Sequence, residues 1–296
     1  MTATDKLRCA FLVMESPGDF VMDHDLAIKP LEALGWSVDC VPWRDPGIRW
    51  REYDAVYICT PWDYIEHPDE FLRVLSAIDR SRPVLVNDLA LVQWTLEKSY
   101  LRDLAARGAA IVPSTWYRDF DEEYASEFFA EHNAKRLVIK PLIGANATDT
   151  FVLQKPLSGQ LLSDLAETFR ERAFFVQPYI ESIETEGEYS LFYFAGEYSH
   201  AIQKVPKSGD FRVQEEHGAN IRSIEPAAAL VAAADKILAM VSPSPVYARA
   251  DFVHDEERGY LLMELELIEP SLYLRTCAEA PERFARAFDR YVREQA

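Results

Sequence analysis

The strongest constraint on this fold is the alternation of short apolar strands with helices through residues 8–87. The segments typical of buried strands are 8–14, 36–43, 54–60 and 83–87. Helices are predicted between them, near 24–34 and 68–79. Strands that alternate with helices form a parallel sheet with helices on its faces. The chain is therefore predicted to begin as an α/β domain, with ligands beyond the carboxyl ends of its strands.

The rest of the chain has a different pattern, which predicts an α+β part. A helix is expected over 95–108, with Thr95 as its N-cap and Gly108 as its stop. The further elements expected are a strand, a loop and a strand over 136–153, a helix near 158–171, a strand at 174–180, a hairpin over 188–206, a helix near 226–241, strands at 246–253 and 260–268, and a helix at 281–294.

The composition argues against several classes of protein. A net charge of −18 disfavours nucleic acid and anionic membranes as partners, because both attract clustered Lys and Arg. No apolar run approaches the roughly 20 residues of a membrane span, and the N-terminus is not typical of a secretion signal. The four cysteines form no CxxC, and the six histidines show no HxxxH or HxH spacing. These patterns predict a cytoplasmic protein with reduced thiols and without a zinc site.

The stretch GYLLMELELIEPS, residues 259–271, is typical of a strand, yet it carries carboxylates among apolar residues. Side chains alternate along a strand, so one apolar face is expected from Leu261, Met263, Leu265 and Leu267. Glu264 and Glu266 would share the other face, roughly 7 Å apart. Neighbouring carboxylates on a half-buried strand need cations, a shared proton or open solvent. The stretch is therefore either an edge strand with a wet face or part of a cation site.

A hairpin between 246–253 and 260–268 would bring Asp251 beside Glu264 and Glu266. Three carboxylates without a nearby histidine form a hard, oxygen-only set that suits Mg²⁺, completed by water and substrate phosphates. Arg249 lies two residues before Asp251 on the same strand face, so a plain ion pair between the two is the alternative.

Several cations precede these carboxylates in the chain. Lys140 ends an apolar strand and opens a loop with Gly144, where small residues would let backbone N–H groups approach a phosphate. Lys204 ends another apolar strand, Arg212 ends the loop after it, and Lys98 lies near a helix start. Taken singly, each could equally be a solvent-facing side chain. The chain contains no GxxxxGK[ST] phosphate loop.

The order of these features is more specific than any one of them. They follow as Lys98, Lys140 with its small-residue loop, VQPYIES, GEYSLFYF, Lys204, Arg212, Asp251 and ExE before Pro270. This series resembles the ATP-grasp family, in the branch of bacterial glutathione synthetase and RimK-like ligases, and it covers residues 95–275. The resemblance implies an ATP-grasp fold behind a Rossmann-like N-terminal domain, with domain limits at 1–94, 95–182 and 183–296.

The resemblance also implies roles for individual residues. Lys98 and Lys140 would hold the ATP phosphates, and the loop 143–149, with Gly144, would be the lid over them. The adenine hinge would be Gln177, Pro178, Tyr179 and Ile180, and Glu188 would bind the ribose. Two Mg²⁺ ions, which Mn²⁺ could replace, would lie on Asp251, Glu264 and Glu266. The catalytic cations around the transferred phosphoryl group would be Lys204, Arg212 and Arg249.

Two departures from the family pattern concern the site itself. The family motif is commonly ExN, whereas ExE in this chain adds one negative charge beside the phosphates. The lid contains a single glycine, Gly144. Glu269 is expected to point away from the metal and to be solvated.

Family ligases activate a carboxylate as an acylphosphate, which an amine then attacks, with release of ADP and phosphate. A small amino-acid derivative is the expected substrate. Trp62 and Asp63 in the segment TPWDY could shape its site, with Asp63 pairing to an amino group, and Arg275 could clamp a carboxylate. The alternatives are a loop packed by its aromatic residues and an ordinary arginine at a helix start.

PWDY, together with YARADFV and LLMELELIEPSLYL, is also similar to the cyclo-ligase branch that closes O-ureido-D-serine to D-cycloserine. Two other functions stay open: a RimK-like ligase that adds amino acids to a peptide or protein, and a non-catalytic ATP-binding module. Related folds often form homodimers or tetramers, and the sequence shows no interface signature that selects between them.

Overall fold

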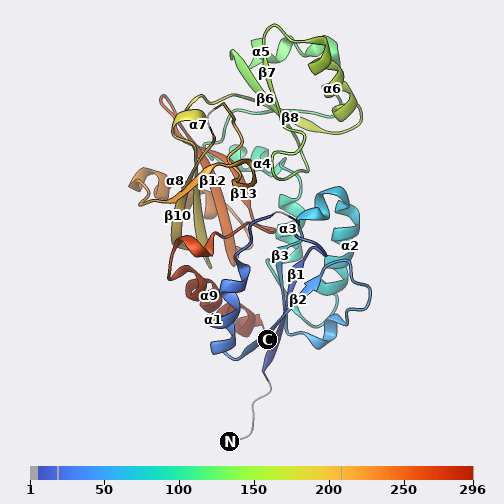
Figure 1. The fold of residues 1–296 in the computed structure, drawn as a ribbon, viewed down its shortest axis with the longest axis vertical. Helices are drawn as coiled ribbons and strands as arrows, with labels where there is room; N and C mark the ends of the chain where they lie inside the picture. Colours follow the sequence, from blue (N-terminus) through green and yellow to red (C-terminus); the bar gives the residue numbers. More distant parts are fainter. Residues whose placement is uncertain (1–5, 19, 208, 296) are drawn as a thin grey trace, which may run out of the picture.

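The computed structural model describes residues 6–18, 20–207 and 209–295, and it contains three sheets that follow one another along the chain. In Figure 1 the first sheet lies at the lower right, the third at the left, and the second forms the upper lobe. Residues 1–5, which belong to the first predicted domain, lie outside the described part. No helix in the described part is long and apolar enough to cross a membrane.

The first sheet is parallel, as predicted, with the strand order β2-β1-β3-β4. Its strands are β1 (Leu7–Val13), β2 (Trp36–Pro42), β3 (Ala55–Thr60) and β4 (Val84–Val86). Its helical segments are η1 (His24–Ala27), α1 (Ile28–Ala33), η2 (Trp50–Glu52), η3 (Trp62–Glu66) and α2 (Pro68–Asp79). Gly35 has φ +93° and ends the helix before β2, a conformation that glycine adopts without strain.

The predicted helix over 95–108 is wrong in its start, because two short helices replace it. They are α3 (Leu89–Thr95) and α4 (Tyr100–Ala106). Asp88 caps the first by accepting from the Leu91 amide, and the Thr95 hydroxyl donates back to the Leu91 carbonyl. The Lys98 amide donates to the Leu142 carbonyl at 2.9 Å, which turns the chain between the two helices. Lys98 therefore lies in a tight connection and not on a helix face.

The second sheet is antiparallel, with the order β5-β8-β6-β7. Its strands are β5 (Thr115–Tyr117), β6 (Arg136–Pro141), β7 (Phe151–Gln154) and β8 (Phe174–Pro178). Its helical segments are η4 (Glu122–Tyr124), α5 (Glu127–Glu131) and α6 (Gly159–Phe169). These elements enclose a separate aromatic core that includes Phe128, Phe169 and Phe174. The second sheet is thus a lobe with its own interior.

The third sheet is also antiparallel, with the order β11-β10-β9-β12-β13. Its strands are β9 (Glu188–Phe194), β10 (Glu197–Val205), β11 (Asn220–Ser223), β12 (Tyr247–Asp255) and β13 (Gly259–Glu266). The accompanying helical segments are α7 (Ser182–Thr185), η5 (Glu215–His217), α8 (Ala228–Leu238), η6 (Leu274–Thr276) and α9 (Ala280–Gln295). Both predicted hairpins are present.

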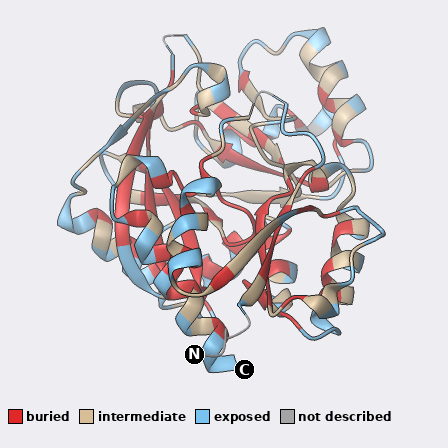
Figure 2. Ribbon diagram, turned by 60° about the horizontal axis from the view of Figure 1, so that its bottom comes forward, coloured by how far each residue is buried: buried red, intermediate tan, exposed pale blue. Residues whose placement is uncertain are grey.

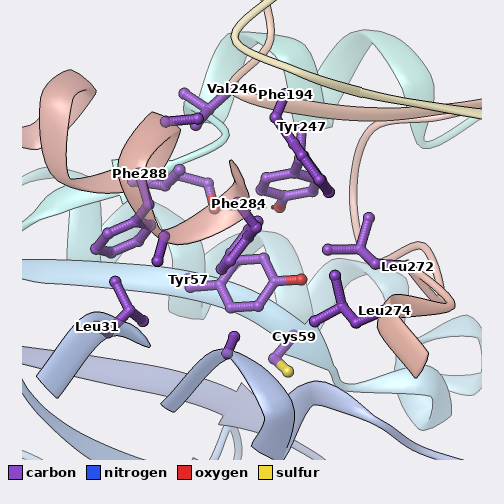
Figure 3. Close-up of a cluster of buried hydrophobic side chains, with 14 of the residues drawn as sticks. Leu31, Tyr57, Cys59, Phe194, Val246, Tyr247, Leu272, Leu274, Phe284 and Phe288 are labelled. Carbon is purple, nitrogen blue, oxygen red and sulfur yellow. Dashed lines mark hydrogen bonds between the residues drawn. The ribbon is translucent and has the colours of Figure 1, made fainter. Parts of the chain in front are cut away.

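The last helix returns to the start of the chain. Phe284 of α9 packs between Tyr57 of the first sheet and Phe194 of the third, with ring centres 5.0 and 5.6 Å apart (Figure 3). The Trp36 indole donates to Asp289 of the same helix at 2.8 Å. Figure 2 shows the resulting pattern, with buried residues along the strands and exposed ones on the outer faces of the helices. The first and third sheets therefore share one hydrophobic core.

The α4 helix packs on the third sheet, although the predicted limits assign it to the central domain. Leu101 and Leu104 share a core with residues of β9, β12 and β13. The domain limits at 94 and 182 thus stay a prediction.

The prediction that Leu261, Met263, Leu265 and Leu267 share one apolar face is wrong, and a β-bulge is the reason. Asp251 pairs with Glu264, but the next residue, Phe252, pairs with Leu262, so Met263 is extra. Leu262 and Leu265 then face the core of the third sheet, whereas Leu261 and Met263 pack in a different cluster beside the second sheet. The bulge divides the apolar residues of this strand between two cores.

Candidate active site

One large cavity lies where the three sheets meet, with a volume of about 220 Å³. Its walls come from η3, α3 and α4 with their connection, β6, β8, the loop 211–216 and the two strands β12 and β13. Most of the expected site residues line it: Trp62, Lys98, Lys140, Gly144, Gln177, Pro178, Tyr179, Ile180, Glu188, Lys204, Arg212, Arg249, Asp251, Glu264 and Glu266. Residues far apart in the sequence thus converge on one space, and only Asp63 and Arg275 of the expected set do not line it.

Lys98 is held at the cavity by two groups. Its ammonium lies 2.8 Å from Glu264 and donates to the Gly144 carbonyl at 2.7 Å. Burial disfavours the charged ammonium, but Glu264 outweighs this effect, so the pKa of Lys98 is raised. Lys98 therefore stays a cation beside the first residue of the ExE motif.

Lys140 differs from its neighbours because, within the described part of the chain, its ammonium has no ion-pair partner. It lies on β6 opposite Phe175 and lines the cavity. Burial lowers the pKa of Lys140, and the nearby Lys98 cation adds to that effect while Glu264 opposes it. An anion delivered to the cavity would supply the charge that this lysine lacks.

Lys204 lies deeper, at the junction of β9, β10 and β12. Its ammonium is 2.6 Å from Glu188 and 3.8 Å from Asp251, and all three side chains are nearly inaccessible to solvent. Burial disfavours its charge, yet Asp251 and Glu188 raise the pKa of Lys204 well above its usual range. Burial raises the pKa of Glu188, which the ammonium of Lys204 opposes. The pair is a buried ion pair on the cavity wall.

Arg249 joins two of the expected metal ligands. Its guanidinium lies 3.0 Å from Asp251 and also binds Glu266, directly opposite on β13. The ion pair that the sequence offered as the alternative for Asp251 is therefore present. Burial disfavours the charged carboxylate of Asp251, but Arg249 and Lys204 outweigh it and lower its pKa. Burial raises the pKa of Glu266 to about 8.

The described carboxylates at the cavity do not form a preassembled metal cage. Among the described residues, no three His, Cys, Asp or Glu side chains are gathered as a ready cluster for an ion. Glu264 and Glu266 nonetheless line the cavity with about a third of their side chains exposed, 32% and 27%. Mg²⁺ is usually held by one or two carboxylates together with water and substrate phosphates, not by a cage of protein ligands. The residues present fit that mode of binding.

The strand β8, predicted as the adenine hinge, lines the cavity, and part of the adjoining backbone is already hydrogen-bonded within the protein. The Tyr179 amide donates to the Arg136 carbonyl at 3.0 Å, so it is not offered to a ligand. The Tyr179 hydroxyl donates to Glu184, and its ring lies 3.9 Å from the Arg136 guanidinium. Gln177 is buried and donates to the Ser114 hydroxyl. Pro178 and Ile180 contribute to the cavity wall beside them.

The loop 143–149 closes one side of the cavity and is anchored by Arg172, which binds Asp149 and the Ile143 carbonyl. Although Gly144 is its only glycine, other residues take up left-handed conformations: Asn146, Ala147 and Asp149 have φ between +54° and +56°. The glycine has a different role, because a Cβ there would approach the Pro141 ring to 2.9 Å. The cation Arg212, on the opposite loop, is held by Asp210 at 2.7 Å.

Two expected substrate residues lie elsewhere. Asp63 accepts a 2.7 Å hydrogen bond from the Trp43 indole and does not line the cavity. Arg275 binds Asp23 and Glu215, and its guanidinium stacks 4.8 Å from the Tyr273 ring, so it ties two loops together outside the cavity wall. Neither residue is therefore placed to contact a substrate in the cavity.

Glu269 is the residue that the sequence interpretation missed. It was expected to be solvated, but it is only 9% exposed and lines the cavity. Burial raises its pKa to about 7, against the effects of the Tyr64 hydroxyl and the Lys98 ammonium. Tyr64 and Tyr273 are also buried and line the same cavity. The sequence signal was the position of Glu269 immediately before Pro270, where the chain leaves the strand and need not alternate.

Comparisons with known proteins agree with this architecture. Residues 9–87 match the profile of the D-cycloserine synthetase DcsG N-terminal domain, and residues 106–246 match that of the prokaryotic glutathione synthetase ATP-grasp domain. The chain is 30% identical over 283 residues to the cycloserine biosynthesis protein DcsG of Streptomyces lavendulae, covering 90% of this chain and 93% of that protein. The protein therefore belongs to the ATP-grasp family and is an ATP-dependent ligase.

Within that family the chain is similar to DcsG in structure as well. The crystal structure of D-cycloserine synthetase DcsG superposes with a TM-score of 0.85 at 27% identity, covering 96% of this chain and 99% of that one. A RimK domain ATP-grasp protein from Sphaerobacter thermophilus shares the fold alone, with a TM-score of 0.69 at 15% identity over 95% and 98% of the two chains. ATP-grasp ligases use ATP and Mg²⁺.

Proposed function

We propose that this ligase closes O-ureido-D-serine, or a closely similar amino-acid derivative, into a ring by intramolecular C–N bond formation. One observation carries the proposal: Lys98, Lys140 and Lys204 converge on one cavity that aromatic side chains and carboxylates also line. The similarity to DcsG over nearly the whole chain supports the choice of substrate. The cavity is lined by residues of the second and third sheets and of η3, so a nucleotide and a small molecule would share one space.

The nucleotide is proposed to lie between the second and third sheets. Adenine would contact the backbone of Pro178 and Ile180, and the ribose would contact Glu188, which lines the cavity beside Lys204. Lys140, with no ion partner in the described part of the chain, and Lys98 would bind the phosphates. The backbone of Gly144 would approach them from the lid.

The metal is proposed to lie on Glu264 and Glu266, with Asp251 behind them on β12. Two Mg²⁺ ions, or Mn²⁺ in their place, would offset the phosphate charge and polarise the γ-phosphoryl group. The second glutamate of the ExE motif is held by Arg249, so the guanidinium balances the additional negative charge of this motif.

Ring closure is proposed to proceed in two steps, formation of an acylphosphate and attack on it by nitrogen. A substrate carboxylate oxygen attacks the γ-phosphorus, the bond to the β–γ bridging oxygen breaks, and ADP leaves. Lys204, Arg212 and Arg249 would stabilise the charge that develops on the transferred group. The ureido nitrogen bound to oxygen then attacks the acyl carbon, loses its proton, and the C–O bond to phosphate breaks. The carbamoyl group stays on the ring nitrogen, and one water molecule would remove it as CO₂ and ammonia to give D-cycloserine. Burial at the cavity protects the acylphosphate from water.

The protein is proposed to work in the cytoplasm, where ATP is supplied, and its four cysteines are unpaired. We expect a homodimer or a tetramer, as is common for related folds. The substrate is a free small molecule in this proposal, not nucleic acid or membrane lipid.

The decisive experiment is Mg²⁺-dependent ADP release with O-ureido-D-serine and a panel of amino-acid derivatives. One derivative should stimulate ADP release, and Glu264→Gln should reduce it at least about a hundredfold because the variant loses a charged metal ligand. Glu256→Gln, an exposed glutamate in the same hairpin, is the matched control and should behave as the wild type.

Two outcomes would overturn the proposal. Normal turnover in Glu264→Gln would remove this residue from the metal site. ATP binding without stimulation by any small molecule would favour a peptide substrate or a binding module. Product analysis by mass spectrometry then separates ring closure, which needs no second substrate, from ligation of two molecules.

A further inference from the structure

The cavity contains a buried carboxylate, that of Glu269, which the proposed reaction does not use. Glu269 is 9% exposed and, within the described part of the chain, no cation forms an ion pair with it. A buried carboxylate without a cation is costly in free energy. Such a group in a cavity is a candidate for ligand binding. Its surroundings indicate which ligand it would bind.

The aromatic side chains near Glu269 come from two parts of the chain. The Trp62 indole donates to the Glu269 carbonyl at 3.0 Å, which fixes the backbone of this residue against η3. The Phe20 ring meets the Trp62 ring edge-on at 5.1 Å. Tyr64 is buried, and its hydroxyl is a hydrogen-bond partner of the Glu269 carboxyl group. A buried carboxylate beside aromatic side chains suits an organic ammonium group, which gains from a charged hydrogen bond away from water.

The position of Glu269 relative to the phosphoryl site gives the second argument. Lys98, Arg249 and Glu269 line the same cavity, and the Arg249 guanidinium donates at 3.2 Å to the carbonyl of Ser271, two residues after Glu269. A ligand with its ammonium group on Glu269 would therefore direct a nearby carboxylate toward Lys98 and Arg249. An α-amino acid carries these two groups on one carbon atom.

We propose that Glu269 binds the α-ammonium group of the substrate and so selects amino acids over carboxylic acids that lack this group. This inference rests on the proposed function for its substrate, and it gives Glu269 the role that the sequence had assigned to Asp63. Trp62 positions Glu269 through the backbone hydrogen bond, and the buried Tyr64 helps to exclude water from the ion pair.

The test compares O-ureido-D-serine with its deamino analogue, 3-(ureidooxy)propanoate, by kcat/KM for ADP release. The wild type should prefer the amino compound at least about tenfold, as expected for a hydrogen bond between charged groups. In Glu269→Gln the preference should largely disappear, while the KM for ATP stays within about twofold. Asp63→Asn makes the same charge change in η3, at a side chain outside the cavity, and should keep the preference of the wild type.

An unchanged preference in Glu269→Gln would overturn the inference and leave the ligase function intact. Glu269→Asp keeps the charge but withdraws it by one methylene, and an intermediate preference is expected. If Glu269→Gln fails to fold, this second variant decides: a preference equal to that of the wild type contradicts the proposal.

A binding measurement separates this inference from the proposed function. D-serine and 3-hydroxypropanoate are titrated into the protein with Mg²⁺ and a non-hydrolysable ATP analogue. Tighter binding of D-serine to the wild type but not to Glu269→Gln would support the ammonium site even if no ureido compound is turned over. Equal binding of both compounds to the wild type would contradict it, whatever the turnover assay shows.

Discussion

At the residue scale, the geometry of the site depends on individual side chains and also on glycines, which have none. Gly187 immediately precedes β9 with φ +84°, and a Cβ there would lie 2.2 Å from the Lys204 carbonyl oxygen. The backbone of β10 can approach Glu188 closely only because this side chain is absent. The buried Lys204–Glu188 pair therefore depends on a glycine that touches neither charged group.

Gly187→Ala is expected to lower the free energy of unfolding by about 3 kcal/mol or more, because a left-handed backbone and a backbone overlap add together. Gly209→Ala is the control, since Gly209 has φ +85° with nothing within 4 Å of an added Cβ. It should cost only about 1 kcal/mol. Urea unfolding measures both values, and equal losses would show that the overlap is relieved by a backbone shift.

The raised pKa of Glu269 predicts how the free energy of unfolding depends on pH. Its pKa is raised from 4.5 to about 7 in the folded protein, so the fold binds this proton more tightly than the unfolded chain does. The folded state therefore loses stability as pH rises through this window. Glu269→Gln removes the loss, and in the absence of metal and nucleotide it should be more stable than the wild type at pH 8, by up to about 3 kcal/mol.

Urea unfolding at pH 5 and pH 8 tests this expectation. The advantage of Glu269→Gln should be small at pH 5 and grow toward pH 8. Glu256→Gln changes an exposed carboxyl group and should show no such growth. A constant difference between the two pH values would mean that the Glu269 carboxyl group does not titrate in this range.

At the scale of the element, periodicity and turn residues predicted most strands and helices. The parallel order of the first sheet follows from strands that alternate with helices, and both antiparallel hairpins follow from Ala195–Gly196 and the short turn before Gly259. The break between α3 and α4 could not be predicted in this way, because it depends on the Lys98 amide reaching Leu142 in another lobe. Local signals contain no information about such a partner.

The bulge in β13 explains the second failure. Alternation assigns Leu261 and Met263 to the face of Leu265, but one extra residue reverses the face of everything before it. Glu264 and Glu266 kept their common face only because both lie after the bulge. Glu269 was misplaced for a related reason, since the chain has left the strand and tertiary packing decides its direction.

At the scale of the whole molecule, α9 ties the beginning of the chain to its end. Phe284→Ala removes a ring from the core shared by the first and third sheets, and it is expected to cost about 3–5 kcal/mol. Because the core is shared, both sheets should unfold in one transition. Arg286→Ala on the exposed face of the same helix should cost less than about 0.5 kcal/mol.

Urea unfolding followed by far-ultraviolet circular dichroism and by tryptophan fluorescence tests the shared core. Coincident curves with a lower midpoint are expected for Phe284→Ala. Two separated transitions would mean that the first sheet folds independently of α9.

The ion pairs around the cavity have a consequence for how ligands enter. Glu264 is engaged by Lys98, Glu188 by Lys204, and both Asp251 and Glu266 by Arg249. In the proposed site, nucleotide and metal would therefore bind by an exchange of partners: phosphates would take over the cations while metal would take over the carboxylates. Such a double exchange leaves the local charge almost constant. Nucleotide alone would leave the carboxylates without cations, and metal alone would leave the lysines and Arg249 without anions, so neither component alone can complete it. Mg²⁺ and ATP should accordingly bind as a cooperative pair, each weakly without the other.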